Sequence, residues 1–288
     1  MKIAIASGKG GTGKTFVATN LFYSLSTFGN HPALVDCDAE APNALAFFKT
    51  ELLNVSEVMQ DVPVINKDAC VLCGKCAEWC NYNAIFILPP AKFIRVIEDL
   101  CHGCGACTIA CEYNAITEKK VIVGKVSKSL FNDKYLMLEA KTEIGVMSPV
   151  PVIKEALKTV RDNSEIVQTL IIDAPPGTSC PFIQTVNEAD FVVLVTEPTP
   201  FGLSDLKQSV ETLNSMKKPY GVVINRAGLG NNDIFNYVEK EKILMEIPFS
   251  KDIASIYSKG KILSEEDSVY AEKFIELYNK IIKVYENV

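Results

Sequence analysis

The first 25 residues constrain the fold more than any other part of the chain. A short apolar run at 3–7 is followed by the glycine-rich stretch 8–15, Gly-Lys-Gly-Gly-Thr-Gly-Lys-Thr, and then by an apolar-periodic segment from Phe16 to Leu25. The run predicts a buried parallel strand, and the periodic segment predicts a helix. Between them, the pattern G-x-x-x-x-G-K-[ST] is typical of a phosphate-binding loop. An α/β fold with a nucleotide site at the start of this helix is therefore expected.

Each part of this loop has a chemical role. Its glycines let backbone N–H groups turn toward a phosphate, and the helix N-terminus adds a positive dipole. Lys14 is expected to reach the β- and γ-phosphates, and Thr15 to ligate Mg²⁺. The residues expected to bind the nucleotide here are Gly8, Gly10, Gly11, Thr12, Gly13, Lys14, Thr15 and Phe16.

Eight of the ten cysteines form two quartets with the same spacing, C-x2-C-x2-C-x3-C. The quartets are Cys70, Cys73, Cys76 and Cys80, then Cys101, Cys104, Cys107 and Cys111. The segments 70–85 and 101–116 align with a shift of 31 residues and end in the same Tyr-Asn-Ala-Ile. This internal repeat indicates a duplicated unit. Three thiolates on a tight loop can hold three corners of an iron–sulfur cubane, while the following helix carries the fourth toward another cluster.

Residues 63–118 resemble the bacterial two-[4Fe-4S] ferredoxin module. The resemblance implies one cluster held by Cys70, Cys73, Cys76 and Cys111, and a second held by Cys101, Cys104, Cys107 and Cys80. The module has proline after each fourth cysteine, whereas this chain has Asn81 and Glu112. Zinc binding and disulfides are the alternative uses of such cysteines.

Lys9 makes the loop resemble the deviant Walker A motif of the MinD/ParA/nitrogenase-iron-protein superfamily. The resemblance implies that Lys9 crosses a dimer interface to the partner's nucleotide. It also gives Asp38, after the apolar run 33–35, the role of orienting the attacking water and sensing Mg²⁺. Asp173, at the end of the apolar run 170–172, would hold Mg²⁺ in a Walker B position. Asn225 and Arg226 take the positions that contact adenine in the family.

These segments imply a parallel sheet wound with helices on both faces, with the nucleotide at the carboxyl ends of the strands. A further strand is expected at 191–195, and helices are expected at 203–216 and 266–286. The ATPase domain is expected at 1–60 and 120–288, with the ferredoxin domain inserted at 61–119. The range 121–138 is expected to be a strand-rich return path.

Composition narrows the class of protein further. The net charge of −6 argues against a nucleic-acid-binding surface. No apolar run reaches the roughly 18 residues of a membrane helix, and no export signal is evident. A cytoplasmic protein without nucleic-acid partners and without a membrane role is expected. The final segment mixes acidic and basic residues, which favours a core-packed helix over a membrane-binding tail.

The combined motifs suggest an ATP-hydrolysing iron–sulfur protein, with ATP or ADP, Mg²⁺ and two [4Fe-4S] clusters as cofactors. In this hypothesis, ATP closes a homodimer, or a heterodimer with a paralogue, and so controls electron transfer to an unidentified redox partner protein. One alternative is a carrier that assembles or delivers iron–sulfur clusters, as Mrp-like relatives do. Another is spatial positioning of the MinD type. Cys37 is expected to be a buried apolar residue, and Cys180 is a weaker candidate for a cluster bridging two subunits.

Overall fold

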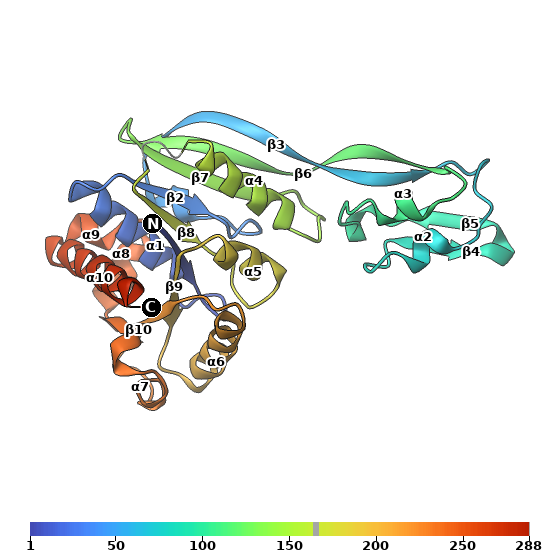
Figure 1. The fold of residues 1–288 in the computed structure, drawn as a ribbon. Coiled ribbons are helices and arrows are strands. Elements are labelled where there is room, and N and C mark those ends of the chain that lie inside the picture. The colour runs from blue at the N-terminus through green and yellow to red at the C-terminus, as the bar shows by residue number, and fades with distance from the viewer. Residues whose placement is uncertain (164–166, 288) are drawn as a thin grey trace.

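The computed structural model describes residues 1–163 and 167–287. Residues 164–166 and 288 of the expected ATPase range lie outside these. Within the described residues, a nine-stranded sheet has the order β11-β10-β9-β1-β8-β2-β7-β6-β3 (Figure 1). Strands from β11 to β7 in this order run parallel. Their bounds are β1 Lys2–Ala6, β2 Pro32–Asp36, β7 Tyr135–Thr142, β8 Thr169–Asp173, β9 Phe191–Thr196, β10 Tyr220–Ala227 and β11 Ile243–Pro248.

Helices cover both faces of the sheet, as the sequence predicts. One face packs against α1 (Lys14–Thr27), α8 (Lys251–Ser258), α9 (Leu263–Glu266) and α10 (Ser268–Glu286). The other packs against α4 (Val150–Arg161), α5 (Cys180–Asn187), α6 (Pro200–Ser215) and α7 (Asp233–Tyr237). Side chains of β1 alternate between these layers, because successive residues of a strand point to opposite faces. Ile3 and Ile5 face α1, whereas Ala4 and Ala6 face α5 and α6.

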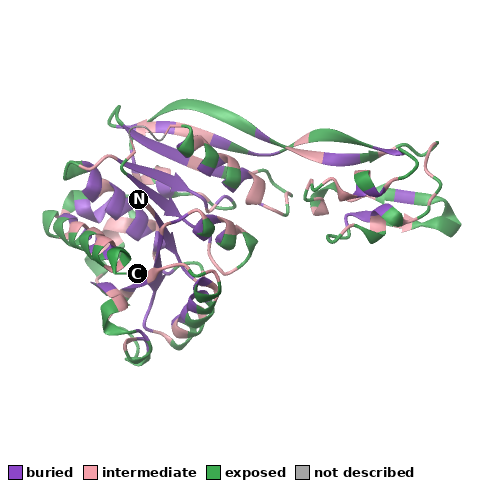
Figure 2. Ribbon diagram, in the orientation of Figure 1, coloured by how far each residue is buried: buried purple, intermediate pink, exposed green. Residues whose placement is uncertain are grey.

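One edge of the sheet departs from the expected parallel arrangement. Strands β3 (Thr50–Ile65) and β6 (Ile116–Phe131) pair antiparallel with each other, and β6 pairs antiparallel with β7. The strand-rich return path expected at 121–138 therefore belongs to β6 and β7. Because β6 meets β7 only from Gly124 onward, residues 116–123 extend beyond β7 and pair with β3 alone, as a two-stranded ribbon. Figure 2 shows the β6 strand of this ribbon as mostly exposed, whereas its β3 strand includes buried residues such as Val58 and Val62.

The cysteine-rich segment lies at the far end of the ribbon, apart from the layered core (Figure 1). It contains α2 (Lys75–Glu78), α3 (Ala106–Ala110) and a two-stranded sheet of β4 (Ile85–Leu88) and β5 (Phe93–Val96). Short 3-10 turns occupy Pro89–Ala91 and Glu98–Leu100 here, and Ala44–Phe47 and Lys240–Lys242 in the core. A small separate apolar cluster, which includes Ile85, Ile94 and Ile116, packs this end.

The last helix, α10, is part of the core. Its buried residues are Ala271, Phe274, Leu277 and Ile281, and the Phe274 ring meets Phe16 of α1 at a centroid distance of 6.2 Å. This placement agrees with the expectation of a core-packed final helix. Among the described residues, no helix combines the length and apolar character needed to span a membrane.

Candidate functional site: a nucleotide pocket and two thiol-lined pockets

A cavity of about 410 Å³ lies where the phosphate loop meets the carboxyl ends of the parallel strands. The adjacent strands β1, β8 and β2 end here because parallel strands present their carboxyl ends at one edge of the sheet. Of the residues predicted to bind nucleotide or Mg²⁺, the cavity is lined by Gly10, Gly11, Gly13, Lys14, Thr15, Phe16, Asp38, Asn225 and Arg226. Gly8, Lys9, Thr12 and Asp173 belong to the same region but do not line the cavity itself.

Thr15 and Asp173 form the inner wall of this region. The Thr15 hydroxyl donates a 2.6 Å hydrogen bond to Asp173 Oδ2. The other carboxylate oxygen, Oδ1, is fully buried and has no hydrogen-bond partner among the described residues. A buried acceptor without a partner is costly, so this oxygen is suited to receive a water molecule held by a metal ion. The hydroxyl and the carboxylate are oxygen ligands of the kind that Mg²⁺ takes in phosphate sites.

The local electrostatics also fit a cationic ligand. Burial raises the pKa of Asp173 well above its usual value, and nearby Asp36 raises it further, against the lowering effects of Thr15 and Lys14. Burial likewise raises the pKa of Asp38, although Lys14 opposes this shift. Burial lowers the pKa of Lys14, while Asp173 is the strongest of the carboxylates that oppose the change. A bound divalent cation would stabilise the charged form of these carboxylates.

Asp36 is a site residue that the motifs did not reveal. It is completely buried at the end of β2. Its Oδ1 accepts the backbone N–H of Asp38 at 3.0 Å, and its Oδ2 accepts those of Asn43 and Ala44, each at 2.8 Å. Burial raises its pKa to about 7, although the three backbone bonds act in the opposite direction. Asp36 therefore organises the loop that presents Asp38 to the pocket.

Lys9, Arg226 and Glu197 form an ionic cluster beside the phosphate loop. Lys9 Nζ lies 2.7 Å from Glu197 Oε1, and Arg226 Nη1 lies 2.7 Å from Glu197 Oε2. Asn225 Nδ2 donates a 2.8 Å hydrogen bond to the carbonyl of Thr12. Glu197 was not anticipated, although it lies two residues after the strand predicted at 191–195, and a charged residue there is a signal for the carboxyl edge of the sheet.

The far wall of the cavity comes from a part of the chain that carries no recognisable motif. It is built by the end of β11, the two residues after it and α8, together with Asn43. The residues are Pro248, Phe249, Ser250, Ile253, Ala254 and Tyr257. Apolar and aromatic surface of this kind suits a nucleobase. Strand β11 was not predicted, so sequence reasoning also missed the residues that follow it.

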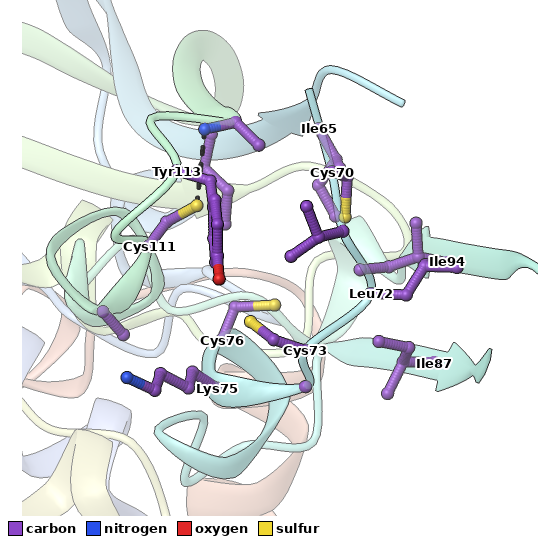
Figure 3. Close-up of a pocket in the computed structure, with 15 residues that line it drawn as sticks. Ile65, Cys70, Leu72, Cys73, Lys75, Cys76, Ile87, Ile94, Cys111 and Tyr113 are labelled. Atoms are coloured by element: carbon purple, nitrogen blue, oxygen red, sulfur yellow. Dashed lines mark hydrogen bonds between the residues drawn. The ribbon is translucent and has the colours of Figure 1, made fainter. Parts of the chain in front are cut away.

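The cysteines fall into two groups of four that mix the sequence quartets. Cys70, Cys73, Cys76 and Cys111 line one pocket, beside Leu72 and Tyr113 (Figure 3). The fourth member thus comes from the second quartet. The backbone N–H of Ala115 donates to Cys111 Sγ at 3.3 Å. A hydrogen bond of this type stabilises a thiolate.

The second pocket has the complementary composition. It is lined by Cys80, Cys101, Cys104 and Cys107. The N–H of Ala84 donates to Cys80 Sγ at 3.3 Å, and that of Gly103 donates to Cys101 Sγ at 3.4 Å. The rings of Tyr82 and His102 stack beside this pocket at a centroid distance of 3.6 Å. The two pockets therefore have matching donor sets and related surroundings.

One of the two substituted positions after the quartets, Glu112, forms an ion pair across the repeats. Glu112 forms a 2.5 Å ion pair with Lys75, which lies between Cys73 and Cys76. This pair connects the two repeats next to the first thiol-lined pocket.

All ten cysteines are free thiols. Cys37 is buried, as expected, and Cys180 is exposed at the start of α5. In residues 1–163 and 167–287, no three His, Cys, Asp or Glu side chains are grouped as ligands of a single metal ion.

The fold and the first pocket define a P-loop nucleotide-binding protein. A family model described as the CobQ/CobB/MinD/ParA nucleotide binding domain matches residues 3–263. The chain belongs to this family, and its P-loop and sheet are of the MinD/ParA ATPase type. The cell division ATPase MinD of Pyrococcus furiosus has the same fold, with a TM-score of 0.57 and 21% identity over 98% of each chain.

Relatives in sequence extend over nearly the whole chain. Two uncharacterized proteins of Methanocaldococcus jannaschii are 34% and 35% identical over 98% and 91% of this chain, covering 96% and 90% of their own lengths. An iron-sulfur cluster carrier protein of Aquifex aeolicus is 24% identical over 99% of this chain and 68% of its own length.

Proposed function

We propose that this protein is a Mg²⁺-dependent ATPase that couples its nucleotide state to electron transfer through two [4Fe-4S] clusters. The proposal rests on one observation above all: a single chain contains a P-loop pocket and two separate pockets that each have four thiols. Bound clusters would supply one-electron redox chemistry at the end of the ribbon. The site residues of the ATPase would be Lys9, Lys14, Asp38 and Asp173.

The nucleotide pocket supports ATP as the substrate. Lys14 at the start of α1 is positioned to contact phosphate, and the unpartnered oxygen of Asp173 suits hydrated Mg²⁺. Hydrolysis should need Mg²⁺ and should fall at least a hundredfold in Lys14→Ala, measured as phosphate release. An equal rate in wild type and Lys14→Ala would exclude this pocket as the ATPase site.

Cross-ligation of the cysteines gives the sharpest test of the cluster proposal. The pocket groupings predict that Cys73 and Cys111 serve the same cluster, whereas Cys104 and Cys111 serve different ones. Wild type purified without oxygen should contain about eight irons per chain. The double variant Cys73→Ser/Cys111→Ser should retain about four irons, and Cys104→Ser/Cys111→Ser should retain almost none.

The opposite pattern would show that each quartet binds its own cluster in sequence order. Iron without acid-labile sulfide, or zinc in its place, would reject the cluster proposal altogether. The variant Cys37→Ser is the matched control, because Cys37 lies in the core of the ATPase fold and not in a thiol-lined pocket. Its iron content should equal that of wild type.

Backbone hydrogen bonds supply a route from the nucleotide pocket to the ribbon. The carbonyl of Ala39, next to Asp38, accepts the N–H of Thr142 at the end of β7 at 2.8 Å. The following residue, Glu143, donates to the carbonyl of Val123 at 3.0 Å, where β6 leaves the core. A movement of the Asp38 loop would therefore act on the base of the ribbon. The coupling free energy between two such sites is commonly ~1–3 kcal/mol.

Coupling between the nucleotide state and the clusters can be measured as a change in the reduction potentials of the clusters. A coupling of about 2.7 kcal/mol corresponds to a shift of about 120 mV for a one-electron couple. Anaerobic electron paramagnetic resonance with redox titration, with and without ATP and Mg²⁺, should show such a shift. Potentials and electron-transfer rates that do not respond to nucleotide would reject coupling and leave the ATPase proposal in place.

A second candidate is an ATP-dependent carrier of iron–sulfur clusters. It is favoured by the likeness to the Aquifex aeolicus carrier protein. Transfer of clusters to an apo-acceptor protein within minutes would support the carrier, whereas clusters retained for hours would support electron transfer. The MinD-type positioning role receives less support, because the apolar face of α10 is packed on α1.

A further inference from the structure

Glu197 holds two cations that belong to different parts of the nucleotide site. Its side chain is only 11% exposed, and its two oxygens each contact one partner at 2.7 Å, Lys9 on one side and Arg226 on the other. Such short contacts between charged groups are among the stronger hydrogen bonds in proteins. No sequence motif assigned a role to Glu197.

The backbone that carries Glu197 is held firmly in place. Glu197 directly follows β9, and its carbonyl accepts the N–H of Thr199 at 2.7 Å. The first turn of α6 packs on it so closely that a Cβ atom on Gly202 would come within 2.2 Å of the Glu197 carbonyl oxygen. The carboxylate is therefore a fixed point, and the two longer cationic side chains are the parts that can move.

The two partners differ in their relation to the nucleotide pocket. Arg226 lines the cavity, and its Nη2 also donates to the carbonyl of Gly11 at 3.3 Å. Lys9 does not line the cavity, although Gly10 beside it does. The pairing with Glu197 thus keeps the Lys9 ammonium out of the pocket of its own chain.

We propose that Glu197 is a positioning residue that retains Lys9 in the nucleotide-free chain and that Arg226 permits its release. Removing one partner from a buried ion pair is unfavourable when a charge is left uncompensated. Here Glu197 keeps Arg226 as a partner after Lys9 departs, so the loss is reduced. The consequence for dimerisation rests on the proposed ATPase function and on the expectation from the loop motif that Lys9 reaches the nucleotide of a partner chain, for which it would have to leave Glu197.

The first test measures Lys9 directly, in the nucleotide-free full-length protein. Pulse acylation with an amine-reactive reagent, read by mass spectrometry, reports the accessibility of each lysine. Glu197→Gln should raise the labelling rate of Lys9 about fivefold, because a partly exposed ion pair is lost. Arg226→Ala should lower it about threefold, because Lys9 becomes the sole partner of Glu197.

These opposite directions separate a positioning role from simple destabilisation, which would raise labelling in both variants. Arg226 is half exposed, so its replacement does not create a core cavity. Glu188→Gln is the matched control, because it removes the ion pair between Arg161 at the end of α4 and Glu188 directly after α5. Lys9 labelling in this control should equal wild type. A rate that does not change in Glu197→Gln would overturn the proposal.

A second measurement follows the ATP-dependent dimer by sedimentation. Glu197→Gln should tighten dimerisation about fivefold when Lys9 is present and should have no effect in the Lys9→Ala background. An equal effect in both backgrounds would overturn the link between Glu197 and Lys9. If wild type forms no dimer with ATP and Mg²⁺ while Lys9 labelling responds as expected, the positioning role of Glu197 is supported and the proposed dimer is rejected.

Discussion

Single buried carboxylates organise the nucleotide pocket in this protein. Asp36 binds three backbone N–H groups, whereas Asp173 contacts Thr15 with one oxygen and leaves the other without a partner in the described chain. The two residues pair with each other in register across β2 and β8. A satisfied carboxylate stabilises the loop, and the unsatisfied one is suited to binding a ligand. Residues of the same type thus have different roles because their hydrogen bonds differ.

Replacement of Asp36 should therefore affect stability. In Asp36→Asn, one acceptor oxygen becomes an amide donor that faces backbone N–H groups. We expect the free energy of unfolding to fall by about 1–3 kcal/mol. Urea denaturation of the nucleotide-free protein measures this loss. Asp133→Asn, in the exposed turn between β6 and β7, is the control and should change little, since asparagine tolerates its positive φ. A wild-type midpoint for Asp36→Asn would show that the three bonds contribute no net stability.

The sequence identified some residues of the nucleotide site and missed others. Lys14 and Thr15 could be placed because a strand, a glycine-rich loop and a helix follow one another within a short span, whereas Asp38 was placed only through the family resemblance of the segment after the apolar run 33–35. Glu197 could not be paired with Lys9 in advance, since that contact depends on β9 lying next to β1 in the sheet. Strand order is a non-local property, so motif spacing along the chain does not reveal it.

At the level of secondary structure, the unusual element is the ribbon of β3 and β6. A bulge between Val58 and Met59 lies opposite residues 122–124, where β6 leaves the core. Gly124 is packed so tightly that a Cβ atom there would lie 2.5 Å from Val152 Cγ2 and 2.6 Å from the carbonyl oxygen of Lys141. The ribbon is therefore anchored at Gly124, where the β6 backbone packs against β7 and α4 and leaves no space for a side chain.

Gly124→Ala should weaken this anchor. Overpacking of a tight site usually costs about 1–3 kcal/mol. We expect a lower unfolding midpoint and faster amide hydrogen exchange in residues 121–126 than in β1, measured by mass spectrometry. The neighbouring substitution Lys125→Ala removes an exposed ion pair with Glu143 and serves as the control, with an expected change below about 1 kcal/mol. Unchanged exchange at 121–126 in Gly124→Ala would contradict the anchoring role.

The sequence did not reveal the ribbon, and the reason is physical. Leu52, Leu53 and Val55 are exposed on β3, so its pattern lacks the alternation of a half-buried strand. Its partner on β6 is also remote, since Thr50 pairs with Phe131. The central strands were predictable because they are buried on both faces and read as continuous apolar runs.

At the scale of the whole molecule, the ribbon separates the nucleotide pocket from the two thiol-lined pockets. The eight residues of β6 that extend beyond β7 correspond to roughly 26 Å of strand. If the proposed clusters are bound, an electron donor or acceptor would approach the cysteine-rich end and not the nucleotide pocket. In this arrangement, ATP would act on electron transfer through the orientation of the ribbon, because the hydrogen bonds from Ala39 to Thr142 and from Glu143 to Val123 lead to its base.

This separation predicts that the cysteine-rich end can be removed without loss of the nucleotide site. Ile65 and Ile116 pair directly across the ribbon, so a two-residue Asn-Gly turn can replace residues 66–115. The shortened chain should fold, bind a fluorescent ATP analogue within about twofold of wild-type affinity and contain no iron, because the nucleotide pocket and both core layers are retained. The full-length double variant Cys73→Ser/Cys104→Ser, expected to lose both clusters, is the control for the effect of iron loss alone. If nucleotide affinity falls tenfold in the shortened chain but not in this control, the distal segment contributes to the nucleotide site, and the separation inferred from the fold is wrong.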